Sequence, residues 1–188
     1  MNKAALKRLA IELRAELGLG THEPFDPFEL AELYGVDVYP LSTLGCAPRV
    51  LEHFQVNRLE VFSGALVPVG TGAVIIENDA HPVVRRRSTG GHEMAHVVLE
   101  HPFTAALVNE GGCRLANKEH EAEAAELSGE LLIPFDAAKR LARRGVTNEE
   151  AAAEFEVSVE VARWRLDSTG ARKIAARQRA AYTRSASR

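Results

Sequence analysis

Two histidines and a glutamate stand at a spacing that suits metal-assisted hydrolysis: His92, Glu93 and His96 form the pattern His-Glu-x-x-His. On a helix, residues four positions apart emerge from one face, so both imidazoles can bind the same ion. Zinc accepts histidine nitrogens in tetrahedral geometry, which makes this pair two of three protein ligands. Glu93 lies one step around the helix, where its carboxylate can reach a water molecule and act as general base. We therefore predict a zinc site with Glu93 as catalytic base, and two histidines merely packed in a helix are the alternative.

The third ligand has to come from another element, and the acidic stretch at residues 118–133 is the first candidate. Its leucines predict a helix with a core side, and Glu123 shares that side by four-residue spacing. Glu126 and Glu130 lie near the same side, whereas Glu121 is expected to point away from it. On the pattern alone, two interpretations are equally favoured: Glu123 is the third ligand, or the acidic residues only form the solvated surface of the helix.

The surrounding sequence predicts elements that could position these residues. Two strand-like runs joined by Pro-Val-Gly-Thr indicate a hairpin at 59–67 and 72–76, and a further strand is expected at 36–41. Apolar spacing and capping residues predict helices at 3–17, 27–34, 82–100, 118–133, 147–155 and 159–166. Residues 42–57 give no clear pattern, and residues 103–116 have the composition of a loop. Gly90 and Gly91, inside the His-Glu-x-x-His helix, indicate that another element packs close to its backbone.

The order of these motifs resembles the ImmA/IrrE family of metallopeptidases, in which a phrase like E-A-N-x-F-A-x-x-L-L-x-P follows the HExxH helix. Aligning that phrase on Leu-Leu-Ile-Pro at 131–134 puts the family's third zinc ligand on Glu123. The segment 75–93 also looks like the family's approach to its active helix, and the resemblance covers about residues 25–170. The residues at four positions differ from those usual in the family: Gly91, Ala125, Leu127 and Ser128. Because the metal ligands and the catalytic base of the family are all present, these differences concern substrate contacts more than activity.

The resemblance implies an α+β fold, a compact zincin-like domain with a small, mostly antiparallel sheet and an HExxH helix. We expect this domain at residues 1–134, a helix-turn-helix-like segment packed on it at 135–170, and a flexible basic tail at 171–188. The glutamates of the second segment would repel phosphate, so packing or partner docking is favoured there. Arg163, Arg165 and the basic tail keep DNA binding as an alternative.

Charge and composition narrow the setting. The formal net charge is −3, and residues 171–188 carry six cationic side chains and no acidic one, which leaves −9 for residues 1–170. A tail of this kind can bind nucleic acid or an acidic partner, or can simply be solvated. Cys46 and Cys113 fit no metal or redox spacing, and no run approaches the roughly 20 apolar residues that span a membrane. Because the first residues also lack the apolar core of a secretory signal, we expect a cytoplasmic protein with free thiols and no membrane association.

The function implied by the resemblance is that of a zinc-dependent endopeptidase acting on another protein, typically a helix-turn-helix repressor of the Xre type. Cutting the repressor would relieve transcriptional silencing, as in phage or mobile-element induction or a stress response. One alternative is a non-catalytic DNA-binding or repressor-docking regulator with a structural metal, and another is zinc hydrolysis of some other amide. His101 is a candidate outer partner of the metal ligands. The sequence leaves the oligomeric state open.

Overall fold

The computed structural model describes residues 1–102 and 117–186, and within them it confirms the predicted α+β class. The strands are β1 (Val38–Pro40), β2 (Gly64–Val69) and β3 (Gly72–Glu77). The helices are α1 (Lys3–Glu16), α2 (Pro27–Leu33), α3 (Pro48–Glu52), α4 (Val83–Val98), α5 (Lys118–Leu132), α6 (Phe135–Arg144), α7 (Asn148–Phe155), α8 (Val159–Ser168) and α9 (Ala171–Ala186). Residues 171–186, expected to be a flexible tail, are thus helical. The loop predicted at 103–116 lies outside the described residues.

The sheet has the order β1-β3-β2 and is mixed. Strands β2 and β3 form the predicted hairpin, in which Val69 pairs with Gly72, while β1 joins the other side of β3 in parallel. Strand β2 begins later than expected because residues 59–61 form a 3-10 turn. Pro40 and Pro68 both lie on the outer strands, where a missing backbone N–H is tolerated.

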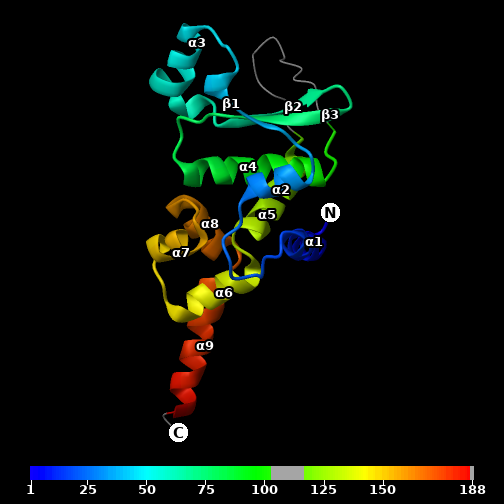
Figure 1. The fold of residues 1–188 in the computed structure, drawn as a ribbon. Helices are drawn as coiled ribbons and strands as arrows, with labels where there is room; N and C mark the ends of the chain where they lie inside the picture. The colour runs from blue at the N-terminus through cyan, green and yellow to red at the C-terminus, as the bar shows by residue number, and fades with distance from the viewer. Residues whose placement is uncertain (103–116, 187–188) are drawn as a thin grey trace.

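The elements are stacked in layers (Figure 1). Helix α4 covers one face of the sheet, α2 and α5 pack against α4, and α1 packs against α5. Helices α6 to α9 form the other end of the molecule, from which α9 projects. Every layer contributes large, fully buried side chains, among them Phe25, Leu30, Ile75, Met94, Leu127 and Phe155. This continuous core fixes α4 between the sheet and α5.

Two adjacent glycines let α4 sit close to both helical neighbours. A Cβ on Gly90 would lie 2.9 Å from the Phe28 ring of α2. A Cβ on Gly91 would lie 3.1 Å from the Ser128 hydroxyl of α5 and 3.7 Å from Leu132. The prediction that these glycines mark close packing is therefore confirmed. It is the contact at Gly91 that sets which face of α5 meets α4.

Two buried arginines donate hydrogen bonds to backbone carbonyls at the C-terminal end of α5. Arg14 of α1 donates to the carbonyl of Leu131 at 2.6 Å, and Arg165 of α8 donates to that of Ile133 at 2.8 Å. Burial lowers the pKa of Arg14 to about 10, although the nearby charge of Glu23 opposes the shift. Carbonyls at a helix C-terminus lack intrahelical partners, so these guanidinium groups stabilise the end of α5.

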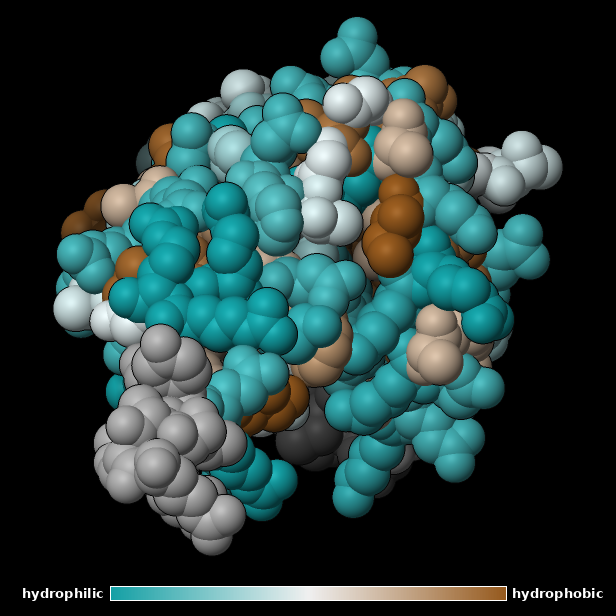
Figure 2. Space-filling model, turned by 90° about the horizontal axis from the view of Figure 1, so that it is seen from below, coloured by the Kyte–Doolittle hydropathy of each residue, from teal (hydrophilic) through white to brown (hydrophobic). Residues whose placement is uncertain are grey.

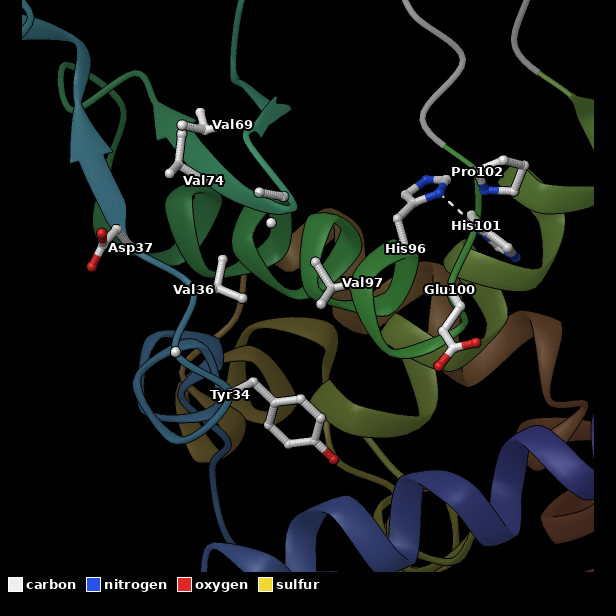
Figure 3. Close-up of a pocket in the computed structure, with 13 residues that line it drawn as sticks. Tyr34, Val36, Asp37, Val69, Val74, His96, Val97, Glu100, His101 and Pro102 are labelled. Carbon is white, nitrogen blue, oxygen red and sulfur yellow. Dashed lines mark hydrogen bonds between the residues drawn. The ribbon is translucent and has the colours of Figure 1, made fainter.

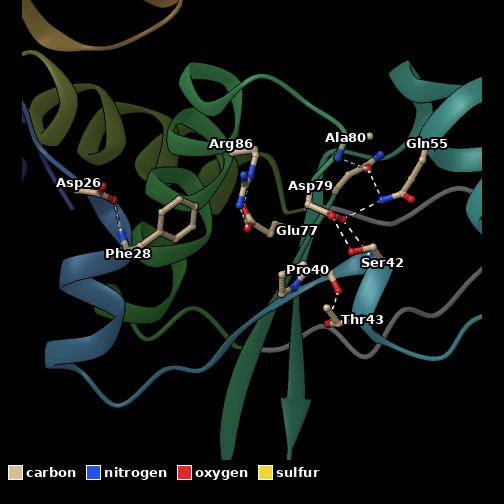
Figure 4. Close-up of polar contacts among 11 residues, drawn as sticks. Asp26, Phe28, Pro40, Ser42, Thr43, Gln55, Glu77, Asp79, Ala80 and Arg86 are labelled. Carbon is tan, nitrogen blue, oxygen red and sulfur yellow. Dashed lines mark hydrogen bonds and ion pairs between the residues drawn. The ribbon is translucent and has the colours of Figure 1, made fainter.

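Residues 42–57, which gave no sequence pattern, are held by a polar cluster at the end of β3 (Figure 4). The buried Asn78 side chain donates to the backbone carbonyls of Phe54 and Phe62, both at 2.9 Å. Asp79 accepts from the Ser42 hydroxyl at 2.7 Å and from Gln55 at 2.8 Å. Side chains far away in sequence therefore organise this region, which includes α3 and a π-helical turn at His53–Asn57.

The end of the molecule from which α9 projects is mainly hydrophilic, with separate apolar residues rather than one continuous apolar patch (Figure 2). Among the described residues, no helix is both long and apolar enough to cross a membrane. Cys46 is a free thiol, as expected, and Cys113 lies outside the described residues.

Candidate functional site

The two motif histidines lie on one face of α4, as their spacing predicted. Their Nε2 atoms are 3.2 Å apart, and their side chains are half-buried. Zinc bonds of about 2.0–2.2 Å in tetrahedral geometry separate neighbouring ligand atoms by about 3.3–3.6 Å. The imidazole nitrogens are therefore spaced as two ligands of one such ion would be.

A carboxylate from α5 joins them, and it belongs to Glu121. One Glu121 oxygen lies 3.2 Å from Nε2 of His92, and the other lies 3.6 Å from Nε2 of His96. Among the described residues these three form the group that could hold a metal ion, with their ligand atoms all within 4.8 Å of one another. Glu121, which was expected to point away from the leucine side of this helix, is thus the acidic residue that lies at the two histidines.

Helix phase explains the position of Glu121. Ser128 and Leu132 lie against Gly91, so the row of α5 that faces α4 contains these residues and those one and two turns before them. Glu121 is seven residues, close to two turns, before Ser128. Leu127, whose side of the helix Glu123 shares, lies about 100° around α5 from Ser128. The signal in the sequence that could have identified Glu121 is the pair of small residues Ala125 and Ser128, since small side chains permit close helix contacts.

Glu123 lies in a different environment. Its carboxylate pairs with the amino group of Met1 and lies 3.3 Å from Nε2 of His101. It is not part of the group formed by His92, His96 and Glu121. Glu123 as a metal ligand therefore stays a prediction, while its observed partners are the amino terminus and His101.

His101 lies directly behind one motif histidine. Its Nδ1 is 2.9 Å from Nδ1 of His96, and its ring stacks on that of His120 with centroids 4.3 Å apart. The His101 side chain is only 7 % exposed. Burial, together with the nearby charge of His120, lowers the pKa of His101 below 6.5, which favours a neutral ring at neutral pH.

Glu93 lies on the sheet side of α4. Its carboxylate is buried and accepts a hydrogen bond from the backbone N–H of Leu66, in the outer strand β2, at 3.1 Å. This contact fixes the side chain beside His92 without including it in the group of candidate ligands. A buried carboxylate that precedes this group on the same helix is a candidate general base.

A pocket of about 580 Å³ extends from His96 and His101 along α4 toward the hairpin (Figure 3). Its walls include Val36, Val74 and Val97, and none of the described residues that line it is a Lys or an Arg. Acidic side chains, Asp37 and Glu100, are also among its lining residues. An apolar pocket with a few polar groups beside a candidate metal centre is a suitable binding site for a segment of substrate.

Arg86 and Arg87, near the start of α4, have structural partners. Arg86 forms a bidentate ion pair with the buried Glu77, which raises the pKa of Arg86. Arg87 pairs with Asp26 and with Glu156, in the turn between α7 and α8. These contacts attach the C-terminal helices and α2 to the start of α4.

The predicted helix-turn-helix-like segment is formed by α7 and α8. Thr147 and Glu150 form the predicted capping box. Arg165, one of the cations that kept DNA binding as an alternative, is buried and pairs with Glu126 and Glu130 of α5. It therefore cannot reach a phosphate, whereas Arg163 is exposed.

Comparison with known proteins places these features in a family. Residues 50–167 match the model of a peptidase domain described as the IrrE N-terminal-like domain. The matched region contains the hairpin, α4, α5 and the helix-turn-helix-like segment. Neither a curated protein nor a solved structure matches the chain significantly.

Proposed function

Since this chain belongs to the IrrE N-terminal-like family of metallopeptidases, we propose that it is a zinc-dependent endopeptidase that hydrolyses a peptide bond in a protein substrate. The observation that carries the proposal is the convergence of His92, His96 and Glu121 beside Glu93. Two imidazoles and one carboxylate are the ligand set of many catalytic zinc sites, which leave a fourth position for water or substrate.

The donor atoms present fit zinc in chemistry and in spacing. Nitrogen and carboxylate oxygen are both zinc ligands, and separations of 3.2 Å and 3.6 Å are close to the edges of a zinc tetrahedron. When bound, zinc would lower the pKa of a water molecule and polarise the scissile carbonyl. We propose His92, His96 and Glu121 as its ligands, and Glu123, the ligand implied by the family resemblance, as the alternative that variants distinguish.

Glu93 is proposed as the catalytic base. Its carboxylate takes a proton from the attacking water and returns it to the amine of the departing peptide segment. The hydrogen bond from Leu66 N–H holds one Glu93 oxygen in place on the sheet side of α4. The apolar pocket along α4 would bind a segment of the substrate and exclude water around it.

The proposed substrate is a helix-turn-helix repressor of the Xre type, whose cleavage inside the cell would relieve silencing. This part of the proposal rests on the resemblance to the ImmA/IrrE family. The rival, a non-catalytic DNA-binding or repressor-docking regulator, is less well supported. A structural zinc site normally has four protein ligands, and the group seen within residues 1–102 and 117–186 has three. Burial of Arg165 also removes a cation from the surface that would meet DNA.

The decisive variant is Glu93→Gln. Glutamine keeps the shape of the side chain and an oxygen that can accept from Leu66 N–H, but it cannot accept the proton from water. We expect the variant to bind zinc as the wild type does, with cleavage lowered by a factor of at least about 10². Zinc content is measured by plasma mass spectrometry, and cleavage by incubating the zinc-loaded protein with purified Xre-type repressors and mapping fragments by mass spectrometry.

Glu121→Gln is the matched control, since it should lose both zinc and cleavage. If the wild type binds zinc but cuts none of a panel of repressors or unstructured proteins, the endopeptidase proposal is wrong. If it cuts proteins other than repressors, only the substrate proposal fails. Cleavage by E93Q at the wild-type rate would show that another group acts as base.

A further inference from the structure

The pocket along α4 reaches the candidate metal centre itself. His96, a candidate ligand, is one of its lining residues, and so is His101, whose Nδ1 lies 2.9 Å from Nδ1 of His96. From there the pocket extends to Val69 and Gly72 at the end of the hairpin. Its volume of about 580 Å³ is in the range of pockets that enclose drug-sized ligands, which are larger than one side chain. A peptide whose scissile bond lies at the metal centre would therefore place neighbouring side chains inside it.

Three valines give this pocket an apolar wall. Val36 precedes β1, Val74 lies in β3 and Val97 lies near the end of α4. In Figure 3, Val36 and Val97 lie between Val74 of the hairpin and Tyr34. A branched side chain of this kind has few rotamers, so the wall keeps its shape. It favours an aliphatic side chain of the substrate over a polar one, which would lose its hydrogen bonds to water there.

Two of the described lining residues are acidic, and none of them is a Lys or an Arg. Asp37 directly precedes β1, and Glu100 follows the end of α4. Figure 3 shows these two residues on either side of Val36 and Val97. The Asp37 carboxylate accepts a hydrogen bond from the Tyr39 hydroxyl. Within residues 1–102 and 117–186, no Lys or Arg forms an ion pair with either carboxylate, so both are available to a cation of the substrate.

The backbone fixes the place of the Glu100 side chain. Helix α4 ends in a Schellman motif, in which Glu100 N–H bonds to the Val97 carbonyl at 3.0 Å and His101 N–H bonds to that of His96 at 3.1 Å. Glu100 has a φ of +51°, at a position of the motif where glycine is the usual residue. A charged residue kept in this left-handed conformation beside a pocket points to a use of its side chain there.

A third carboxylate lies near the pocket through Tyr34, another of its lining residues. The Tyr34 hydroxyl donates to Glu16 of α1 at 3.1 Å. Burial and this contact raise the pKa of Tyr34 above 10, so the hydroxyl keeps its proton at neutral pH. Residues 1–170 as a whole carry a formal charge of −9. The field around the pocket therefore favours the approach of a basic segment.

We infer that this pocket selects protein segments in which an aliphatic side chain lies next to a lysine or an arginine. The inference rests on the proposed endopeptidase function and names the substrate class of the same site. The aliphatic side chain would pack on the valines, and the cation would lie at Asp37 or Glu100. The apolar stem of a lysine or an arginine can also lie along the valines while its charge stays at a carboxylate.

The test is peptide cleavage by the full-length, zinc-loaded protein. A mixture of synthetic peptides is digested, and the cut sites are identified by mass spectrometry. Sites with Lys or Arg next to Leu, Ile or Val should be enriched over matched sites with Gln. For the peptide that is cut fastest, replacing the cation by Gln should lower kcat/KM by at least about 4-fold, and replacing it by Glu should lower kcat/KM further.

Variants connect this preference to the pocket. Asp37→Asn and Glu100→Gln should each reduce the preference for the basic peptide by about 2- to 5-fold, the range for an exposed ion pair, and the double variant by about 4- to 25-fold if the two act independently. Val74→Thr keeps the branched shape but adds a hydroxyl, so it should lower the rate for aliphatic peptides and leave the preference for a cation. Glu149→Gln, which removes the same charge from an exposed position on α7, is the matched control and should change neither.

Binding separates recognition from catalysis. Zinc-loaded Glu93→Gln and its combination with the double variant are titrated against a fluorescein-labelled basic peptide, with anisotropy as the readout and circular dichroism to verify folding. The double variant should bind this peptide more weakly. Equal binding would show that the pocket has another occupant, such as a small molecule or a second copy, and would overturn the inference. Cleavage without a preference for a cation, or with the same preference in the double variant, would overturn it and leave the endopeptidase function standing. A zinc-loaded wild type that cuts no peptide would refute the proposed function, and the inference with it.

Discussion

Substitution of Arg165 by Met tests whether the helix-turn-helix-like segment is built into the catalytic domain. The Arg165 side chain is 1 % exposed and pairs with Glu126 and Glu130, while its Nε donates to the Ile133 carbonyl. Methionine fills similar volume without charge. In this variant Glu126 would keep its ion pair with Lys3, at 2.9 Å. Glu130, whose side chain is only 3 % exposed, would lose its cationic partner and be left with a buried, uncompensated charge.

The expected loss is large because one partner of a buried pair is removed. Breaking such a pair typically costs about 3–5 kcal/mol. For a chain of 188 residues, each kcal/mol shifts the melting temperature by about 2–4 °C, so the variant should melt about 6–20 °C lower. Replacing Glu130 by Gln in the same protein should recover part of the loss. The amide can still accept from Phe135 N–H, which donates to Glu130 at 2.9 Å.

Urea unfolding provides the assay, followed by circular dichroism and by the fluorescence of Trp164, the single tryptophan. Arg163→Met is the matched control, because Arg163 is exposed on the same helix, and it should change stability by less than about 0.5 kcal/mol. Equal stability of the two variants would refute the assignment of Arg165 as a buried structural cation. It would also restore Arg165 as a candidate for contact with DNA.

Three further predictions concern packing, pH and metal. Gly90→Ala should destabilise by up to about 2 kcal/mol in urea unfolding, because a Cβ 2.9 Å from the Phe28 ring costs more than the gain in helix propensity. A Cβ on Gly91 would lie 3.1 Å from the rotatable Ser128 hydroxyl and at an ordinary contact distance of 3.7 Å from Leu132, so Gly91→Ala should be neutral or stabilising. Burial alone would raise the pKa of Asp79, but hydrogen bonds from Ser42 outweigh this effect and lower the pKa below 3.8. The stability that this carboxylate contributes should therefore be lost as the pH falls from about 4 through the folded-state pKa. Asp79→Asn should abolish this pH dependence of the free energy of unfolding. Removal of metal by a chelator should lower the melting temperature of the wild type and leave that of Glu121→Gln unchanged, as seen by differential scanning fluorimetry.

Features governed by local sequence were predicted well. The four-residue spacing of His92 and His96 fixed their common face, because helix geometry alone determines it. The capping box at Thr147 and the hairpin at residues 64–77 likewise depend on residues a few positions apart. In each case the interacting groups are neighbours along the chain, so the pattern contains the information.

Residues 42–57 illustrate what local patterns omit. Their short α-helical and π-helical turns are stabilised by Asn78 and Asp79, which follow the next two strands. No periodicity within the segment specifies those contacts. The burial of His81 has the same origin, since its ring lies 3.2 Å from the carbonyl of Phe62, a residue distant along the chain.

The choice between Glu121 and Glu123 depends on a third kind of information, the rotational phase of a helix whose two sides are both buried. Leu127 and Leu131 mark the side of α5 that faces the core, but they do not mark the side that faces α4. That side is marked by small residues lying over Gly91, the glycine whose position in the helix predicted close packing. Where two helices approach each other through small side chains, the small residues mark the side of each helix that lies in the contact. Polar residues one or two whole turns away from them lie on that same side, so the small residues identify such polar groups better than the apolar residues do. The relative zinc affinities of E121Q and E123Q measure whether that phase, and the site derived from it, is correct.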